Sequence, residues 1–220
     1  MMDFLQRAWG ALRGAIPGLF RSRMAAPDWT ADRARILLVG PSGAGKSTLV
    51  NALLGEGTAE AGSGAPVTRG TTWYGRNSAL PVALGDTRGL ESVASADQVA
   101  ALEAALSALA AGRRPHLVWL VINAEGGRAF SGAGTLGALA ASLRQAGIPF
   151  LVVLTHAEPG EKAHAELRTR IAAVMGDVPI AAVNTLPLMG EDGAVLLPVH
   201  GVEALWRASL PFLPALAVRP

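Results

Sequence analysis

Nine consecutive residues, from Gly40 to Thr48, combine glycines, one lysine and three hydroxyl groups in an arrangement suited to holding a chain of phosphates. The run Gly-Pro-Ser-Gly-Ala-Gly-Lys-Ser-Thr fits the pattern G-x-x-x-x-G-K-[ST] without a mismatch. Glycines allow a tight turn whose N–H groups point inward, the lysine reaches the outer phosphates, and the serine hydroxyl ligates Mg²⁺. The predicted nucleotide contacts are Ser42, Gly43, Ala44, Gly45, Lys46 (also catalytic), Ser47 (also a metal ligand) and Thr48.

Two later stretches supply groups that a phosphate loop alone lacks. Asp86 opens the run Asp86-Thr87-Arg88-Gly89 at the end of an apolar stretch. Its carboxylate is predicted to hold Mg²⁺, and the N–H of Gly89 to contact the terminal phosphate as a catalytic group. Between the two lies Thr68, which we expect to complete the metal shell and to act in catalysis. Thr71 is the second choice for that role.

A third stretch suggests recognition of a base. The sequence Thr155-His156-Ala157-Glu158 follows an apolar run. The carboxylate of Glu158 can accept hydrogen bonds from the N1–H and the exocyclic amine of guanine, a donor pair that adenine lacks. His156 is expected to stack on the base and Asn184 to lie beside the guanine oxygen. The alternative is an ordinary solvated loop at a strand end.

Composition narrows the class of protein. A chain of 220 residues, half of them hydrophobic, is long enough for one α/β domain with extensions. It has no cysteine, which excludes disulfides and thiol chemistry and is compatible with the cytoplasm, where we expect the protein. The excess positive charge lies in residues 1–35, while residues 36–220 carry a net charge of −1. We therefore expect no nucleic-acid partner.

The elements that must position these groups alternate along the chain. Apolar runs bounded by turn residues predict strands, and runs with helical spacing predict helices. Such alternation predicts a mostly parallel sheet with helices on both faces and a ligand at the carboxyl ends of the strands. The expected strands are 35–39, 71–78, 80–85 (ending at Asp86, with a loop over 86–95), 117–122, 149–155 and 178–183, and the expected helices are 46–54, 96–111, 132–146, 160–175 and 201–210.

The two ends of the chain differ from this body. Residues 1–24 place aromatic and aliphatic side chains at helical spacing among four arginines, which predicts an amphipathic helix. Such a helix either lies on an anionic membrane surface or packs on a protein partner or on the body of the chain, and we favour the body slightly. Residues 25–34 are expected to form a linker, and residues 211–220 an apolar tail interrupted by proline.

The ordered stretches resemble those of the Era-like and paraseptin-like branches of the P-loop GTPases, which include immunity-associated and chloroplast-import GTPases. The resemblance covers about residues 35–210. It implies a GTPase domain over those residues, GTP or GDP with Mg²⁺ as ligands, and switching loops at about 55–72 and 86–97. The base-recognition stretch departs from the usual Asn/Thr-Lys-x-Asp, because His156 and Glu158 replace the lysine and the aspartate.

Two positions indicate slow hydrolysis. Leu90 stands where Ras-type GTPases carry a glutamine that orients the attacking water, and leucine cannot do so. Gly43 stands where potassium-activated members carry asparagine. We expect the missing group to come from a stimulating protein or from a second copy of the chain. Arginines in the predicted loops are candidates, although each is more simply a surface residue: Arg69, Arg88 and Arg128.

Three other classes of protein remain open. The phosphate-binding string also occurs in guanylate kinases and in ABC-type ATPases, but residues 55–70 lack the Arg, Tyr and acidic residues of a monophosphate site. No Leu-Ser-Gly-Gly-Gln stretch typical of an ABC ATPase is present. A nucleotide-binding scaffold with negligible turnover, which recruits a membrane or a protein partner, is the third alternative and is favoured by Leu90.

Overall fold

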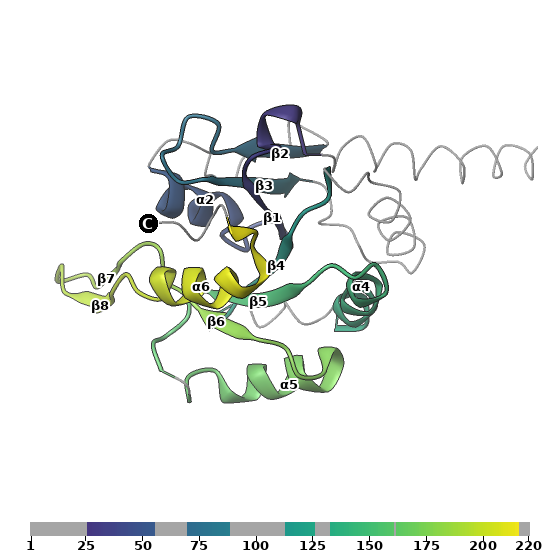
Figure 1. Cartoon of the computed structure of the whole chain (residues 1–220). Helices are drawn as coiled ribbons and strands as arrows, with labels where there is room; N and C mark the ends of the chain where they lie inside the picture. Colours follow the sequence, from purple (N-terminus) through teal and green to yellow (C-terminus); the bar gives the residue numbers. More distant parts are fainter. Residues whose placement is uncertain (1–25, 56–69, 89–112, 126–132, 161, 216–220) are drawn as a thin grey trace, which may run out of the picture.

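The computed structural model describes residues 26–55, 70–88, 113–125, 133–160 and 162–215. Six strands in these ranges form one sheet in the order β2-β3-β1-β4-β5-β6 (Figure 1). All neighbouring strands are parallel except β2, which runs antiparallel to β3 at the edge. The mostly parallel sheet predicted from the sequence is thereby confirmed. The bounds are β1 (Ala34–Val39), β2 (Gly70–Tyr74), β3 (Val82–Arg88), β4 (Leu117–Asn123), β5 (Phe150–Thr155) and β6 (Ile180–Ala182).

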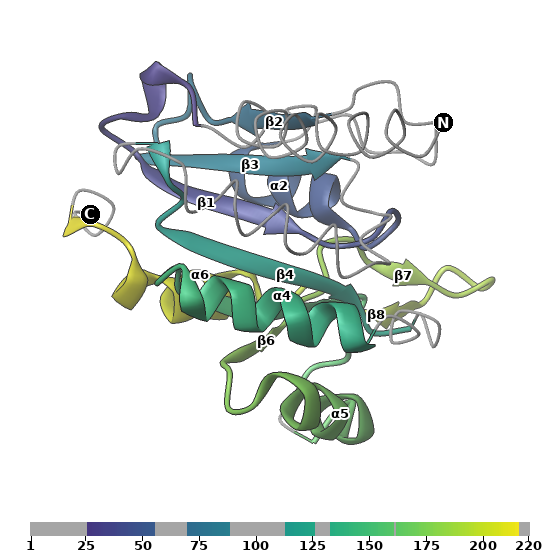
Figure 2. The same cartoon turned by 90° about the vertical axis from the view of Figure 1, so that its right-hand side faces the viewer.

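Helices cover both faces of this sheet, as the two perpendicular views show (Figures 1 and 2). On one face lie α4 (Ala133–Gln145) and α5 (Ala165–Met175). On the other lie α2 (Lys46–Leu54) and α6 (Val202–Ser209), followed by the short 3₁₀ helix η3 (Leu210–Phe212). This three-layered arrangement confirms the predicted α/β class.

The central strands are apolar along their length because both of their faces are covered. Every residue of β1 and β5 is buried. Successive side chains of a strand point to opposite faces, so Val152 packs in the α4/α5 layer and Val153 in the α2/α6 layer. In the second layer the ring N–H of Trp119 donates to Ser209 Oγ (3.0 Å), which fixes α6 to β4.

Three predicted boundaries were wrong. Strand β3 does not end at Asp86 but continues to Arg88, because β2 pairs with it as far as the Gly70–Arg88 partners. The predicted strand 71–78 ends at Tyr74, before a turn in which Gly75 adopts a positive φ of 104°. Helix α5 starts at Ala165 rather than near residue 160, since His164 has a left-handed φ of 59°.

One feature of the described chain was absent from the prediction. Strands β7 (Leu188–Met189) and β8 (Val195–Leu197) form an antiparallel hairpin between β6 and α6. The hairpin projects from the body, at the left of Figure 1. Several predicted features lie outside the described residues, namely the segment 1–24, the helix 96–111 and most of the loops 55–72 and 86–97.

The stretch predicted to be a linker contains a 3₁₀ helix, η1 (Asp28–Thr30). Thr30 is buried, and Asp28 forms an ion pair with Arg113, just ahead of β4. These contacts anchor the chain beside the starting ends of the central strands. None of the helices in the described ranges combines the length and the hydrophobicity that crossing a bilayer requires.

Candidate nucleotide-binding site

The phosphate-binding stretch forms the turn between the carboxyl end of β1 and helix α2. A Cβ atom on Gly40 would lie 2.2 Å from the carbonyl oxygen of Val121 in the neighbouring strand β4, so only glycine fits there. Gly43 and Gly45 have φ values of 75° and 84°, which L side chains rarely adopt. The sequence therefore uses glycine where the turn approaches β4 and where the backbone reverses into the helix.

The other residues of this turn differ in exposure. Ser42 and Gly43 are exposed at its tip, and Ala44 is buried beneath them. Thr48 is half-buried in the first turn of α2. The tip thus offers backbone N–H groups to a ligand at the positive end of a nine-residue helix.

Lys46 begins α2 and folds back over the turn. Its side chain is 7% exposed, and Nζ donates to the carbonyl oxygens of Gly40 (2.8 Å) and Pro41 (2.9 Å). These two carbonyl oxygens help to satisfy a largely buried ammonium group. The positive charge is thereby held above the loop in which a phosphate chain would lie.

The predicted metal ligands Ser47 and Asp86 come together. Ser47 Oγ donates to Asp86 Oδ2 (2.7 Å), and Asp86 is 1% exposed. Its other oxygen, Oδ1, is buried and has no hydrogen-bond partner among the described residues. A buried carboxylate oxygen without a donor is costly unless something else occupies it. Oxygen ligands of this kind suit Mg²⁺, so the two residues fit the predicted metal.

Thr155 supports the phosphate loop rather than pointing at a base. Its Oγ1 donates to the carbonyl oxygen of Ala44 (2.7 Å), and its side-chain carbons lie 3.4 Å from the Cβ position of Gly45. Thr155 is buried at the end of β5. The end of β5 and the phosphate loop are therefore in direct contact, as a nucleotide site spanning both requires.

The loop after β5 is held by two histidines that the sequence did not suggest. The N–H of Glu158 donates to His164 Nε2 (2.9 Å), and His200 Nε2 donates to the carbonyl oxygen of Ala157 (2.7 Å). His156 has a left-handed φ of 51° and is half-buried, and the side chain of Glu158 is exposed. Glu158 therefore stands on a fixed backbone with its carboxylate open to solvent.

Asn184 does not take the position expected for it. It is 3% exposed, and its Nδ2 donates to the carbonyl oxygens of Leu186 (2.6 Å) and Pro198 (3.0 Å). Its backbone N–H donates to His200 O (3.0 Å). The backbone N–H and the side-chain amide of Asn184 thus bind the base of the β7–β8 hairpin, so Asn184 positions the hairpin instead.

Other predicted site residues are not placed. Thr68 and Gly89 lie outside the described residues, together with Leu90, Arg69 and Arg128. Thr71, the second choice for the metal, lies within β2 opposite Thr87 of β3. Arg88 ends β3, where its backbone pairs with β2.

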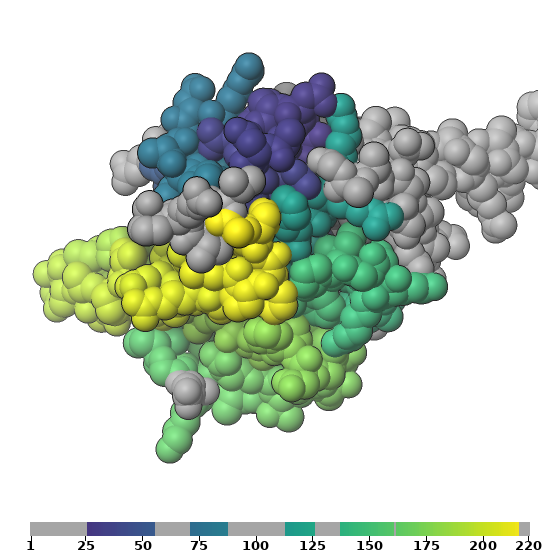
Figure 3. Space-filling model, viewed as in Figure 1, coloured from purple at the N-terminus to yellow at the C-terminus, as the bar shows by residue number. Residues whose placement is uncertain are grey.

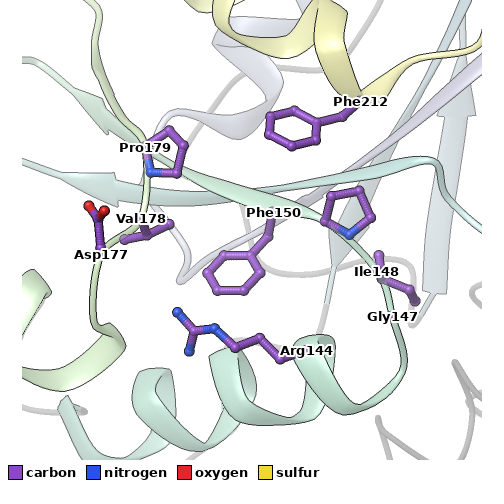
Figure 4. Close-up of a pocket in the computed structure, with 9 residues that line it drawn as sticks. Arg144, Gly147, Ile148, Phe150, Asp177, Val178, Pro179 and Phe212 are labelled. Carbon is purple, nitrogen blue, oxygen red and sulfur yellow. The ribbon is translucent and has the colours of Figure 1, made fainter.

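A hollow of about 420 Å³ lies at the end of the sheet where β5 and β6 begin, whereas the phosphate loop follows the carboxyl end of β1. The guanidinium of Arg144 lies 5.1 Å from the ring of Phe150 there (Figure 4). Its lining is mostly apolar and shares no residue with the phosphate loop, so it is not the nucleotide site. The lining residues are Arg144, Gly147, Ile148, Pro149, Phe150, Asp177, Val178, Pro179 and Phe212.

Comparison with known families decides the class of this site. A family model described as 50S ribosome-binding GTPase matches residues 35–156, more than half of the chain. The chain belongs to this GTPase family. Membership excludes the guanylate kinase and ABC-type ATPase alternatives that the phosphate-binding string left open. The narrower assignment to the Era-like or paraseptin-like branch stays a prediction.

Solved structures agree on the fold. Era from Aquifex aeolicus bound to GDP·AlF4⁻ is 19% identical over 82% of this chain and 56% of that chain, with a TM-score of 0.55. Toc33 from Arabidopsis thaliana in complex with Mg²⁺ and GMPPNP is 16% identical over 82% and 84%, with a TM-score of 0.52. A structure of the chloroplast translocon components atToc33 and psToc159 has a TM-score of 0.57 at 17% identity over 82% and 83%. Among curated proteins, none is significantly similar in sequence.

Proposed function

We propose that this GTPase is a switch that binds GTP and GDP with Mg²⁺ and, alone, hydrolyses GTP slowly. The observation that carries the proposal is the hydrogen-bonded pair of Ser47 and Asp86 next to Lys46. A carboxylate oxygen without a donor, a hydroxyl and a cation surround the place where the β- and γ-phosphates would lie. These groups would bind a triphosphate and its metal together.

The chain's own groups would divide the work. The N–H groups of residues 42–47 would cradle the phosphates, and Lys46 would leave the carbonyls of the loop to neutralise charge on the outer phosphates. Ser47 and Asp86 would hold Mg²⁺, directly or through water. Bound there, the metal would supply charge neutralisation between the two outer phosphates. Thr68 and Gly89 are proposed to contact the terminal phosphate and so to report its presence.

Guanine selectivity is proposed to depend on Glu158. Its side chain is exposed three residues after Thr155, which contacts the phosphate loop, on a backbone that His164 and His200 hold in place. The two donors of the guanine edge match its two oxygens, while adenine would leave them without a donor. His156, on the same loop, would cover a face of the base.

Slow turnover follows from Leu90 and Gly43, neither of which can orient water. We propose that a stimulating protein or a second copy supplies the missing group. Dimerization is important for the GTPase activity of the chloroplast translocon components atToc33 and psToc159, which supports the second copy here. Leu90 equally favours a scaffold that binds nucleotide and turns over negligibly.

Single-turnover hydrolysis of radiolabelled GTP, measured over a range of protein concentrations, tests these alternatives. We expect a low rate in dilute protein that rises with concentration, and no turnover by the Lys46→Ala variant, which supplies the background. A fast rate that is independent of concentration would refute slow intrinsic hydrolysis. A rate at background under all conditions would favour the scaffold.

Localisation in the cytoplasm with peripheral membrane contact through residues 1–24 remains a prediction. Sedimentation of the full chain with anionic vesicles, compared with a chain lacking residues 1–24, measures that contact directly.

A further inference from the structure

The β7–β8 hairpin gathers nearly all of the exposed large apolar side chains of the described residues. Of the seven, six lie between residues 186 and 199, and the seventh is Leu80 at 41% exposure. In the space-filling view the hairpin stands out from the body at the left (Figure 3). An apolar patch of this kind marks an interaction surface. Its residues are Leu186 (59% exposed), Leu188 (49%), Met189 (50%), Val195 (55%), Leu196 (64%) and Val199 (54%).

The patch occupies both faces of the hairpin. Leu188 pairs with Leu197 and Met189 with Val195, so the two pairs point to opposite faces, and Leu196 is an extra residue at the irregularity between them. A two-stranded ribbon is marginally stable by itself, and this one contributes only Leu197 to the buried residues. A partner that buries these exposed apolar side chains would therefore stabilise the hairpin.

The base of the hairpin is nevertheless fixed. Asn184 and His200 pair through both backbone hydrogen bonds (3.0 and 2.9 Å), and Asn184 Nδ2 binds the carbonyl oxygen of Pro198. The apolar surface is thus presented by an anchored element and is not the end of a loose loop. Such preformed surfaces bind at a lower entropic cost than segments that must first be ordered.

The charge of the hairpin restricts its partner. Its turn carries Glu191 and Asp192, both exposed, and residues 186–199 contain no lysine or arginine. Two carboxylates at the tip oppose insertion into an anionic membrane surface. They favour a partner that is apolar and basic.

We propose that the hairpin binds the N-terminal segment, residues 1–24, of the same chain. The segment carries four arginines and one aspartate, which complement Glu191 and Asp192. Its apolar residues at helical spacing would cover the hairpin, with Trp9 and Leu12 at the centre.

The segment is long enough to reach the hairpin. The described chain begins at Ala26, whose N–H donates to Arg113 O near the starting ends of the strands. The hairpin follows the far end of β6, so the path runs roughly one strand length, about 20 Å, along the sheet and then across it. Extended, residues 16–25 would span roughly 33 Å, which leaves residues 1–15, with Trp9 and Leu12, free to dock.

Docking of residues 1–24 on the hairpin would also affect the nucleotide site, and this consequence rests on the proposed function. His200, which closes the base of the hairpin, binds Ala157 of the loop that carries Glu158. Cover over the hairpin would restrain this loop and slow nucleotide release. Docking of residues 1–24 does not require bound nucleotide. A failure of the docking proposal can therefore be distinguished from a failure of the proposed function.

The absence of cysteine from the chain permits a direct test of docking by engineered disulfides. Cysteine is introduced at Trp9 or Leu12 together with Leu196→Cys, and the full chain is oxidised in dilute solution. The matched control carries Leu80→Cys instead. Leu80 is a demanding control because its carbonyl accepts from Arg33 (2.8 Å), close to where the segment joins the body.

We expect intramolecular cross-linking with Leu196→Cys in at least one pairing, in several-fold excess over every Leu80→Cys pairing. The reversal Glu191→Lys with Asp192→Lys should reduce it several-fold, and Arg7→Glu with Arg13→Glu should restore it. Equal yields at both positions, or a cross-linked dimer, would overturn the proposal. So would vesicle binding by the full chain that is lost on replacing Leu188 and Leu196 with serine, since the hairpin would then contact lipid. Nucleotide binding by each variant confirms that it is folded.

Discussion

Replacement of Asp86 by asparagine should weaken the binding of nucleotide with Mg²⁺ without destabilising the apo protein. The carboxylate is 1% exposed and accepts one hydrogen bond from Ser47, while Oδ1 has no donor among the described residues. Asparagine removes a buried charge and retains an acceptor for Ser47. The apo protein should therefore be unchanged in stability or gain about 1 kcal/mol.

Binding of nucleotide in the presence of Mg²⁺ should weaken, because a neutral amide is a poorer partner for the cation or its water. A hydrogen bond to a charged group contributes about 1.5–3 kcal/mol, which corresponds to roughly 10- to 150-fold in affinity. The loss should appear only with the metal. Equilibrium titration of a fluorescent GDP analogue, with Mg²⁺ and with EDTA, measures both affinities.

The neighbouring Thr87→Val variant is the control. Thr87 Oγ1 donates to Leu38 O (2.7 Å) of the neighbouring strand β1 and not to Ser47. This variant should therefore lose about 1–2 kcal/mol of stability and keep its metal dependence. An Asp86→Asn protein that gains as much affinity from Mg²⁺ as the wild type would refute the assignment of Asp86 to the metal.

Three further predictions concern other contacts. Thr155→Val removes the hydrogen bond to Ala44 and should weaken GDP and GTP equally, about 5- to 30-fold by titration, whereas Thr155→Ser should not. Burial, followed by the charge of Arg35, lowers the pKa of His116 to about 4. Between about pH 6.5 and pH 4, His116 is therefore protonated in the unfolded chain and neutral in the folded protein. The free energy of unfolding should fall as the pH is lowered through that range. Urea unfolding at pH 7 and pH 4.5 should show a loss on the order of 1 kcal/mol that His116→Gln removes. Glu158→Ala should reduce the preference for GDP over ADP at least tenfold, and an unchanged ratio would exclude Glu158 from base recognition.

The glycine turn between β1 and α2 was predictable because the residues that form it are consecutive in the sequence. Glycines, Lys46 and Ser47 occupy adjacent positions, and the strand and helix on either side follow from local apolar patterns. Asp86 was identified in the same way, although its strand continues beyond it. That boundary depends on pairing with β2, a contact that no local pattern encodes.

Roles that depend on distant contacts were not predictable. Thr155 was assigned to the base, but it lies against Ala44, which is far from it in the sequence. Asn184 was expected at the base as well, yet its amide binds carbonyls of a hairpin that had not been anticipated. His164 and His200 have no sequence signal of their own, because their function is to hold the backbone of a neighbouring loop.

The hairpin itself did leave a signal. The turn Gly190-Glu191-Asp192-Gly193 separates two apolar runs, a pattern typical of a β-hairpin. It differs from an ordinary hairpin in that its apolar residues remain exposed, and only the structure shows that. The hairpin could therefore be predicted from the sequence, whereas the exposure of its apolar side chains could not.

The most direct test of the central claim is calorimetric titration of the full chain with GTP, GDP, ATP and GMP in the presence of Mg²⁺. We predict that GTP and GDP bind at least 100-fold more tightly than ATP, that GMP does not bind measurably, and that Lys46→Ala abolishes binding of all four. ATP binding as tight as that of GTP would contradict the assignment of a guanine-nucleotide switch.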